Sequence, residues 1–247
     1  MLQLVFFRRK SLKINVINNL GDTLNGSAAD DGGEGDNATG RRGYHHGRLK
    51  DALIEAARDL IEQRGPQGFS LTEAARLVGV TPAAPYRHFS DRDALMGEVA
   101  RRGFELFNDR LRQAWNEGRP EAETAFSRMG RAYLDFARQE PGYYRSMFTR
   151  APELDASCPP GGVGPPVAAA QSFALLNEAA GAVLRARRRS GCDPAHLALQ
   201  VWALSHGAAT LMLGGYLPGA GGSDAYSLLE SGLRTLVRVD DGFTPQI

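Results

Sequence analysis

The chain has 247 residues, with 29 Lys and Arg side chains against 28 Asp and Glu side chains and a formal net charge of +1. This length suits one or two domains with a sizeable core, and the near-neutral balance, taken alone, argues against a nucleic-acid-binding protein. The two cysteines, Cys158 and Cys192, lack metal-ligand spacing and do not make a disulfide framework. We expect free thiols, no cofactor and no metal, with a redox sensor that uses both cysteines as the alternative.

Residues 1 to 40 lack the apolar content of a folded segment. Residues 21 to 40 are rich in Gly, Asp, Asn and Ala, a composition typical of disorder. The apolar start, Met1 to Phe7, is short and precedes its basic cluster, whereas a secretory signal has the opposite order. We therefore expect a disordered tail or a misassigned translation start. We also expect a cytoplasmic protein, because no stretch reaches the length of a membrane span.

A first helix is predicted from about residue 47 to residue 64. Its apolar residues recur at helical spacing, and Gly65-Pro66 ends it. Just before it, Arg41 and Arg42 are placed to reach a groove or a phosphate. Residues 41 to 103 carry eleven Lys and Arg against eight Asp and Glu, so this part of the chain is basic although the whole is not.

Residues 69 to 89 predict two short helices joined by a tight turn. Ser70 and Glu73 have the spacing of a capping box at the start of the first helix. Gly79 follows where a left-handed residue ends a helix, and Thr81-Pro82 supplies an N-cap and a first-turn proline for the second helix. A unit of this length and turn is typical of a helix-turn-helix, whose second helix enters a major groove of DNA.

The second helix would end in Tyr86-Arg87-His88-Phe89, which combines a phenol, a guanidinium and an imidazole beside an apolar anchor. Such polar groups bind phosphates and base edges. Pro85 lies inside this helix and removes one amide donor, so its first turn is expected to be tighter or bent. Ala83 and Ala84 are small enough to touch a thymine methyl group, or they simply permit close approach to DNA.

The rest of the chain is helical in pattern, with no sustained alternation that would indicate strands. Ser90-Asp91 caps a long helix to about Gly118, and Asp193 and Ser223 cap two later helices. A loop rich in Pro and Gly is expected at residues 150 to 166. Further helices are predicted at residues 120 to 140, 141 to 148, 167 to 190, 193 to 216 and 223 to 238. These elements predict an all-α chain of about nine helices.

Two motifs resemble those of a known family. Tyr86-Arg87-His88-Phe89, followed by Asp91-Arg92-Asp93-Ala94-Leu95, resembles the signature of the tetracycline-repressor (TetR) family of bacterial transcription regulators. Pro85 departs from that signature, which has an aliphatic residue before the Tyr. Trp202 to Gly207 is similar to the Trp-His-Gly (WHG) pattern of one class of TetR-type regulatory domain.

The resemblance implies a division of the chain and a function. A three-helix helix-turn-helix domain would occupy residues 41 to 90, and a helical ligand-binding and dimerisation domain would occupy residues 91 to 240. The expected function is a ligand-responsive repressor that binds a palindromic double-stranded DNA operator as a homodimer, with an unknown small-molecule effector and no membrane partner. Two recognition helices about 34 to 36 Å apart would meet successive major grooves.

The expected DNA contacts have structural alternatives. Ser70 and Thr81 are caps first, and Arg87 has Asp91 or Asp93 as alternative partners. The candidate DNA-contact residues are Arg41, Arg42, Ser70, Thr72, Thr81, Ala83, Ala84, Tyr86, Arg87, His88 and Arg92.

A surplus of aromatic and Met side chains over a minimal core permits an apolar effector pocket. Its candidate lining residues are Phe104, Phe107, Met129, Tyr133, Phe136, Tyr144, Met147 and Phe173. Trp202 and His206 lie four residues apart on one helical face, and Gly207 allows another backbone to approach. They form either a buried Trp with a hydrogen-bonded core His, or a direct ligand contact.

The last two helices carry more apolar side chains than one helix pair buries between its members. In proteins that resemble this one, such helices from two subunits form a four-helix dimer interface. The candidate interface residues are Leu197, Val201, Leu204, Gly207, Ala208, Leu211, Leu229, Leu233 and Leu236.

Two other classes of function were weighed. An all-helical enzyme is disfavoured because no nucleophile and base, metal-ligand spacing or Gly-rich phosphate loop occurs at fixed spacing. An architectural DNA-binding protein would use the same helix-turn-helix without a ligand, and a change of DNA affinity with small molecules would distinguish it.

Overall fold

The computed structural model describes residues 38–149, 165–189, 191–217 and 223–238. The predictions made for residues 1 to 37, for the loop at residues 150 to 164 and for Cys158 lie outside the described residues. The chain divides into two units, Met1–Thr39 and Gly40–Ile247, and the features below belong to the second.

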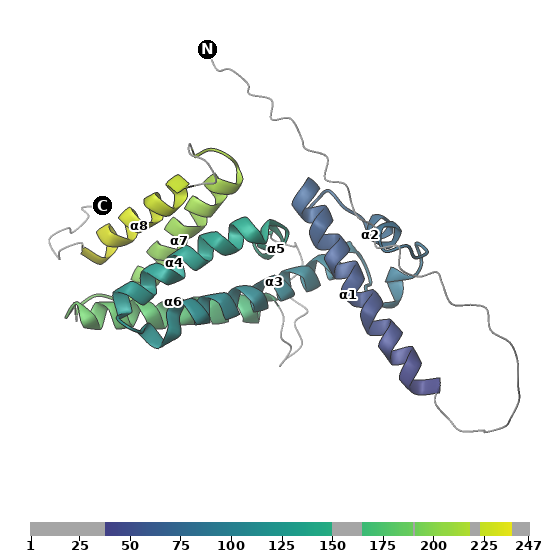
Figure 1. Cartoon of the computed structure of the whole chain (residues 1–247), viewed down its shortest axis with the longest axis horizontal. Helices are drawn as coiled ribbons and strands as arrows, with labels where there is room; N and C mark the ends of the chain where they lie inside the picture. The colour runs from purple at the N-terminus through teal and green to yellow at the C-terminus, as the bar shows by residue number, and fades with distance from the viewer. Residues whose placement is uncertain (1–37, 150–164, 190, 218–222, 239–247) are drawn as a thin grey trace, which may run out of the picture. The chain divides into compact units, whose positions relative to one another are not determined.

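The described residues form eight α-helices and two short 3-10 helices, with no strand among them (Figure 1). The helix-turn-helix unit consists of α1 (Ala38–Arg64), α2 (Leu71–Leu77) and the 3-10 helix η1 (Pro85–Arg87). The bundle consists of α3 (Arg92–Trp115), η2 (Asn116–Gly118), α4 (Ala122–Gln139), α5 (Pro141–Met147), α6 (Pro165–Ala186), α7 (Pro194–Leu213) and α8 (Ser223–Arg238). The all-α prediction is confirmed.

Capping side chains begin three helices where the sequence predicts. The Ser70 hydroxyl accepts from the Glu73 amide at 3.2 Å, and the Glu73 carboxylate accepts from the Ser70 amide at 3.0 Å. Asp91 accepts from the Ala94 amide at 2.7 Å at the start of α3, and Asp193 caps α7 in the same way. These bonds satisfy amides that the first turn of a helix leaves without partners.

The start of α1 differs from the prediction. The helix begins at Ala38, so Arg41 and Arg42 lie within it rather than before it. No proline interrupts residues 38 to 64, and a helix can therefore extend beyond its apolar stripe.

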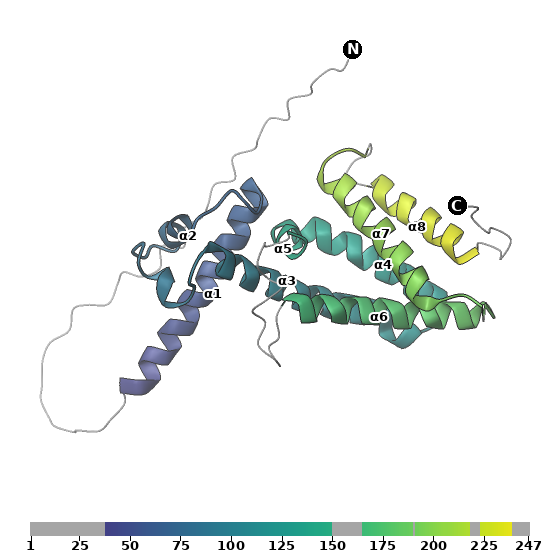
Figure 2. The same ribbon diagram turned by 180° about the vertical axis from the view of Figure 1, so that it is seen from behind.

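Each part of the chain has its own buried side chains. Phe89, the predicted apolar anchor, and Leu95 are buried in the same apolar cluster as Leu53, Ile54 and Ile61 of α1. In the bundle, α3 packs against α4, α5 and α6. Both views show α8 lying along α7 (Figure 1, Figure 2). The two parts meet through α1, α3 and α5.

One described helix is long and apolar enough to cross a membrane by length and composition, the segment Val167–Ala186 of α6. The prediction that no stretch reaches that length was therefore wrong. In this structure α6 packs against α3, α4 and α7, and helices in the core of globular proteins share such a composition.

Candidate nucleic-acid interface and ligand cavity

The segment expected to form the second helix of the helix-turn-helix is a short 3-10 turn. An α-helix capped at Thr81 would make its first backbone hydrogen bond from residue 85 to the Thr81 carbonyl. Pro85 has no N–H to donate. The Ala84 amide instead donates to the Thr81 carbonyl at 3.0 Å, and the His88 amide donates to the Pro85 carbonyl at 2.9 Å. The predicted α-helix is therefore wrong, although the expected effect of Pro85 on the first turn is found.

The turn before this segment agrees with the prediction. Gly79 has φ +73°, the left-handed conformation that favours glycine. The Val80 amide then donates to the Ala75 carbonyl at 3.0 Å, which closes the end of α2. The chain therefore leaves α2 in a fixed direction toward the 3-10 turn.

The side chains of Tyr86 and Arg87 project from this turn into solvent. The Tyr86 side chain is 59% exposed although it is a large aromatic. Arg87 is exposed, and among the described residues it forms no ion pair, so the alternative pairing with Asp91 or Asp93 is absent there. A phenol and a guanidinium side by side are suited to phosphate and base edges.

Other candidate DNA residues differ in exposure. Thr81 and Ala83 are exposed, whereas Thr72, Ala84 and His88 are partly buried. Arg76, which the sequence analysis omitted, is also exposed at the end of α2. In the sequence, only its position on the polar face of a short helix indicated that Arg76 was a candidate DNA contact.

Arg92 is partly buried, and neighbouring side chains hold its guanidinium. Its guanidinium donates to Gln67 at 2.7 Å and to Asp93 at 2.6 Å, and it lies over the Phe69 ring at 5.9 Å from the ring centroid. The Ser70 hydroxyl is likewise engaged with Glu73. Both side chains stabilise the helix-turn-helix unit, so neither is well placed to bind DNA.

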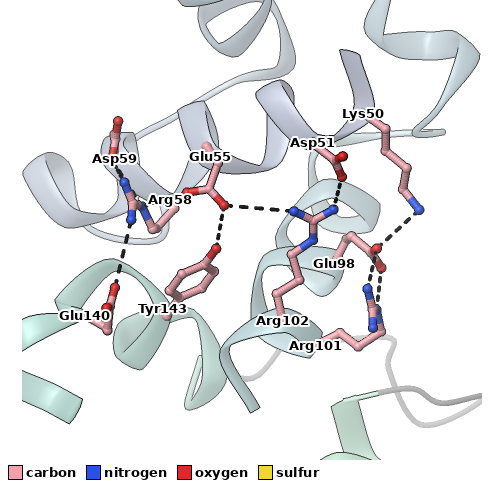
Figure 3. Close-up of polar contacts among 10 residues, drawn as sticks. All are labelled: Lys50, Asp51, Glu55, Arg58, Asp59, Glu98, Arg101, Arg102, Glu140 and Tyr143. Atoms are coloured by element: carbon pink, nitrogen blue, oxygen red, sulfur yellow. Dashed lines mark hydrogen bonds and ion pairs between the residues drawn. The ribbon is translucent and has the colours of Figure 1, made fainter. Parts of the chain in front are cut away.

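Polar contacts join α1 to α5 (Figure 3). The Tyr143 hydroxyl donates to Glu55 at 2.7 Å, and Arg58 lies 3.9 Å from Glu140. Arg145 donates to the Glu62 carbonyl near the end of α1 at 2.8 Å. Helix α5 is thus fastened to α1 along its length, which ties the helix-turn-helix unit to the bundle.

A second set of contacts joins α1 to α3 (Figure 3). Arg102 pairs with Asp51, and Lys50 lies 3.2 Å from Glu98. Hydrogen bonds from Arg101, opposed by burial and aided by Lys50, lower the pKa of Glu98 to about 2. This carboxylate is therefore ionised at neutral pH and holds both cations.

The first cavity lies inside the bundle and has a volume of about 170 Å³. Its described walls come from α3, α4, α6, α7 and Phe148, and none of these lining residues is charged. Phe173 and Trp202 line it from partly exposed positions, with their rings 6.5 Å apart and nearly perpendicular. This apolar space can take an uncharged ring or a short hydrocarbon.

Five of the eight candidate pocket residues line this cavity: Phe104, Phe107, Met129, Tyr133 and Phe173. Tyr144 lines a second cavity instead. Phe136 and Met147 line neither, because Phe136 is fully buried and Met147 packs on Gly103. Val201 and Ser205 of α7 also line the first cavity although the sequence did not predict them, and so does Trp202, for which a ligand contact was the alternative prediction.

The second cavity is more polar and lies beside the end of α1, with a volume of about 350 Å³. Its walls include Arg145, Thr149, Thr210 and His206, together with Pro66 from the segment after α1. Among the described residues that line this cavity, Arg145 is the one charged side chain. The first and second cavities share one wall residue, Phe148.

His206 joins two tyrosines at the boundary between the cavities. Its Nδ1 atom lies 2.9 Å from the Tyr144 hydroxyl and 3.3 Å from the Tyr133 hydroxyl. Burial raises the pKa of Tyr144 to about 12 and lowers the pKa of His206. A neutral imidazole that accepts at Nδ1 carries its proton on Nε2, so His206 remains a donor.

The expected buried Trp was wrong, since Trp202 is 40% exposed in the single chain. The expected hydrogen bond of His206 is present, and the side chain also lines the second cavity. His206 therefore both packs in the core and lines the second cavity.

The outer face of α7 and α8 differs from the predicted interface. Leu197, Val201, Ala208, Leu229 and Leu233 are buried within the single chain. Helices of the same chain, α4 and α6 among them, cover these five side chains, so their assignment to a partner subunit was wrong. Leu204 and Leu236 are partly buried in the same packing.

The outer face keeps Gly207 and Leu211 of the predicted set and adds other side chains. Leu199, Leu211 and Leu228 are each 39% to 50% exposed. Ala203 is exposed between them, and a Cβ added at Gly207 would meet nothing within 4 Å. Leucines around small residues suit the close approach of a second helix pair.

Comparison with known protein families assigns both parts of the chain. Residues 53–99 match the model described as bacterial regulatory proteins, tetR family. Residues 126–236 match the model described as tetracyclin repressor-like, C-terminal domain. Neither description names the WHG class, which stays a prediction.

Individual proteins show the same likeness. The chain is 29% identical over 100 residues to the uncharacterized HTH-type transcriptional regulator YobS of Bacillus subtilis. That match covers 40% of this chain and 51% of YobS, so it spans about half the length of the relative.

Two solved structures share the fold over most of their length. A protein of unknown function from Rhodococcus sp. RHA1 is 31% identical, with a TM-score of 0.63, over 79% of this chain and 96% of that one. A putative TetR-family transcriptional regulator from Rhodococcus sp. is 22% identical, with a TM-score of 0.56, over 77% and 99%.

Proposed function

The chain belongs to the TetR family of bacterial transcription regulators, and from this premise we propose a ligand-responsive repressor that binds a palindromic DNA operator as a homodimer in the cytoplasm. Family membership makes it a DNA-binding regulator and not an enzyme. We assign DNA binding to residues 41 to 90 and ligand binding and dimerisation to residues 91 to 240.

The observation that carries the DNA-binding role is the pair of exposed side chains on the 3-10 turn. Tyr86 and Arg87 follow a helix with a complete capping box, so a rigid unit presents them. Tyr86 would bind a phosphate through its hydroxyl. Arg87 would bind a phosphate or a base edge, and Ala83 would lie against a base.

Arg41, Arg42, Thr72, Thr81, Ala84 and His88 complete the proposed contacts. Ser70 and Arg92 are poorer candidates than the sequence indicated, because each is engaged within the unit.

The test is selection of bound fragments from genomic or random DNA, followed by titration at several salt concentrations. If each half-site neutralises about three phosphates, log affinity should fall against log salt with a slope of about −5. A slope near zero would refute the DNA-binding role.

Two substitutions sharpen this test. Tyr86→Phe and Arg87→Ala should weaken binding, and Arg87→Ala should make the slope shallower. Arg119→Ala is the control, since Arg119 is a strongly exposed cation of the bundle. Replacing Arg92 should lower stability rather than the salt slope.

Ligand response is supported by the position of α5. Phe148, directly after this helix, lines both cavities, while Tyr143 and Arg145 contact α1. A ligand that displaces α5 would therefore move the DNA-binding unit. Coupling of about 1 to 3 kcal/mol would lower operator affinity about 5- to 150-fold, and operator DNA would weaken ligand binding by the same factor.

A further inference from the structure

The two cavities have complementary chemistry on either side of one aromatic ring. The described walls of the first cavity are almost wholly apolar, and no charged side chain of the described residues lines it. The second cavity has one cation, Arg145, and hydroxyl groups from two threonines. Phe148 separates them, with its ring 4.7 Å from His206 and 6.0 Å from Phe104.

The sizes limit what each cavity can take. An apolar cavity of roughly 150 Å³ binds benzene, so the first cavity at about 170 Å³ has room for one ring. A charged group would be costly there because nothing would replace its water. The second cavity, at about 350 Å³, has the Arg145 guanidinium as a donor for a charged group, while the hydroxyls of Thr149 and Thr210 donate to backbone carbonyls.

We propose that the effector is a small amphiphile, an apolar ring joined by a short chain to a carboxylate, with the ring in the first cavity and the carboxylate beside Arg145 in the second. This proposal deepens the ligand response proposed above and rests on it for its biological meaning. The chain of the ligand passes Phe148, the residue that lines both cavities, and His206 is a further wall residue of the second cavity.

Arg145 also explains how such a ligand would act. In this structure the guanidinium donates to the Glu62 carbonyl near the end of α1. A carboxylate attracts the same guanidinium more strongly than a neutral carbonyl does. Ligand binding therefore competes with the contact that fastens α5 to α1, and the DNA-binding unit is released as the ligand binds.

The experiment is calorimetric titration of the full chain, without DNA, with 4-phenylbutyrate and its uncharged analogue 4-phenylbutyramide. The acid should bind about tenfold more tightly than the amide, as a charge-assisted hydrogen bond predicts. Equal affinity of the two probes, or no binding of either, would overturn the proposal.

Two variants locate the two halves of the ligand. Arg145→Gln should reduce the preference for the acid to less than about twofold and leave the amide unchanged. Ala169→Phe places a ring in the first cavity and should abolish binding of both probes. Arg112→Gln is the control, because it removes an exposed cation that lines neither cavity.

A preference for the acid that survives in Arg145→Gln, or binding that survives in Ala169→Phe, would refute the placement. Thermal unfolding of each variant shows that it is folded. Since the titration contains no DNA, its result is independent of operator binding. Failure of the regulator function and failure of this ligand assignment are therefore distinguishable.

Discussion

The candidate functional residues of the helix-turn-helix unit lie on its surface, whereas those of the bundle lie in its interior. In the first, Tyr86 and Arg87 are neighbours in sequence and exposed to solvent. In the second, the cavity walls come from helices far apart in sequence and face inward. Substitutions of these two exposed side chains should therefore change DNA affinity with little effect on stability, whereas substitutions of cavity-lining side chains should change stability and ligand binding together.

The largest expected effect concerns the outer face of the bundle. Gly207→Leu adds a side chain where the single chain has open space, so the monomer should fold normally. If α7 and α8 form the dimer interface, two such side chains should oppose association by about 1 to 3 kcal/mol each. Sedimentation should show a shift toward monomers.

A matched control variant separates the effect of packing at the interface from the effect of replacing a glycine within a helix. Gly97 in α3 also has open space around a would-be Cβ. Gly97→Leu should leave the oligomeric state unchanged. A fully dimeric Gly207→Leu variant would place the interface elsewhere.

The second effect concerns the junction of the two regions. A Cβ at Gly142 would lie 2.5 Å from the Arg58 carbonyl oxygen. Gly142→Ala should therefore lower the free energy of unfolding by about 1 to 3 kcal/mol, measured by urea denaturation. Gly97→Ala should instead raise it by about 0.5 to 1 kcal/mol. Equal behaviour of the two variants would contradict the close packing of α5 on α1.

A smaller effect should distinguish residues that stabilise the DNA-binding unit from residues that contact DNA. Ser70→Ala removes the capping hydroxyl and should cost about 1 kcal/mol of stability. Tyr86→Phe should leave stability within about 0.5 kcal/mol, since Tyr86 is exposed. Ser227→Ala, at an exposed position of α8, is the control for serine loss. Denaturation of the three variants gives their free energies of unfolding. If Tyr86→Phe were the least stable of them, the assignment of Tyr86 as an exposed residue that does not support the fold would be wrong.

The smallest effect is a pH dependence in the bundle. Burial lowers the pKa of His206 below its usual 6.5, so the unfolded chain binds the proton more readily. The stability from neutral His206 is present above pH 6.5 and is lost as the pH falls through the lower folded pKa. His206→Gln should remove this part of the acid sensitivity, whereas His196→Gln, at an exposed position of the same helix, should not.

Local sequence signals predicted the helix ends and part of the DNA-binding unit. The capping box at Ser70 and the left-handed Gly79 depend only on neighbouring residues, and both are present. The predicted recognition α-helix failed because Pro85 removes the first α-helical hydrogen bond. Arg92 was misjudged because its partner Gln67 lies 25 residues away in the chain.

The bundle was less predictable for a physical reason. Apolar spacing shows that a side chain faces inward, but it does not show whether it meets another side chain or a cavity. Phe136 and Phe107 have the same pattern, yet only Phe107 lines the first cavity. Likewise, Leu197 and Leu229 were assigned to a partner subunit, whereas helices of the same chain bury them.

The close approach of Gly142 to the backbone of Arg58 also limits the direction in which the DNA-binding unit can move. Two surfaces already in backbone contact cannot close further, so while they stay in contact α1 can move on α5 only by sliding along it, the small shear motion of packed helices. Such sliding turns a DNA-reading unit without bringing it nearer to the bundle. In a dimer, an effector would therefore alter the spacing and relative tilt of the two units, and spin labels on both would report the change directly.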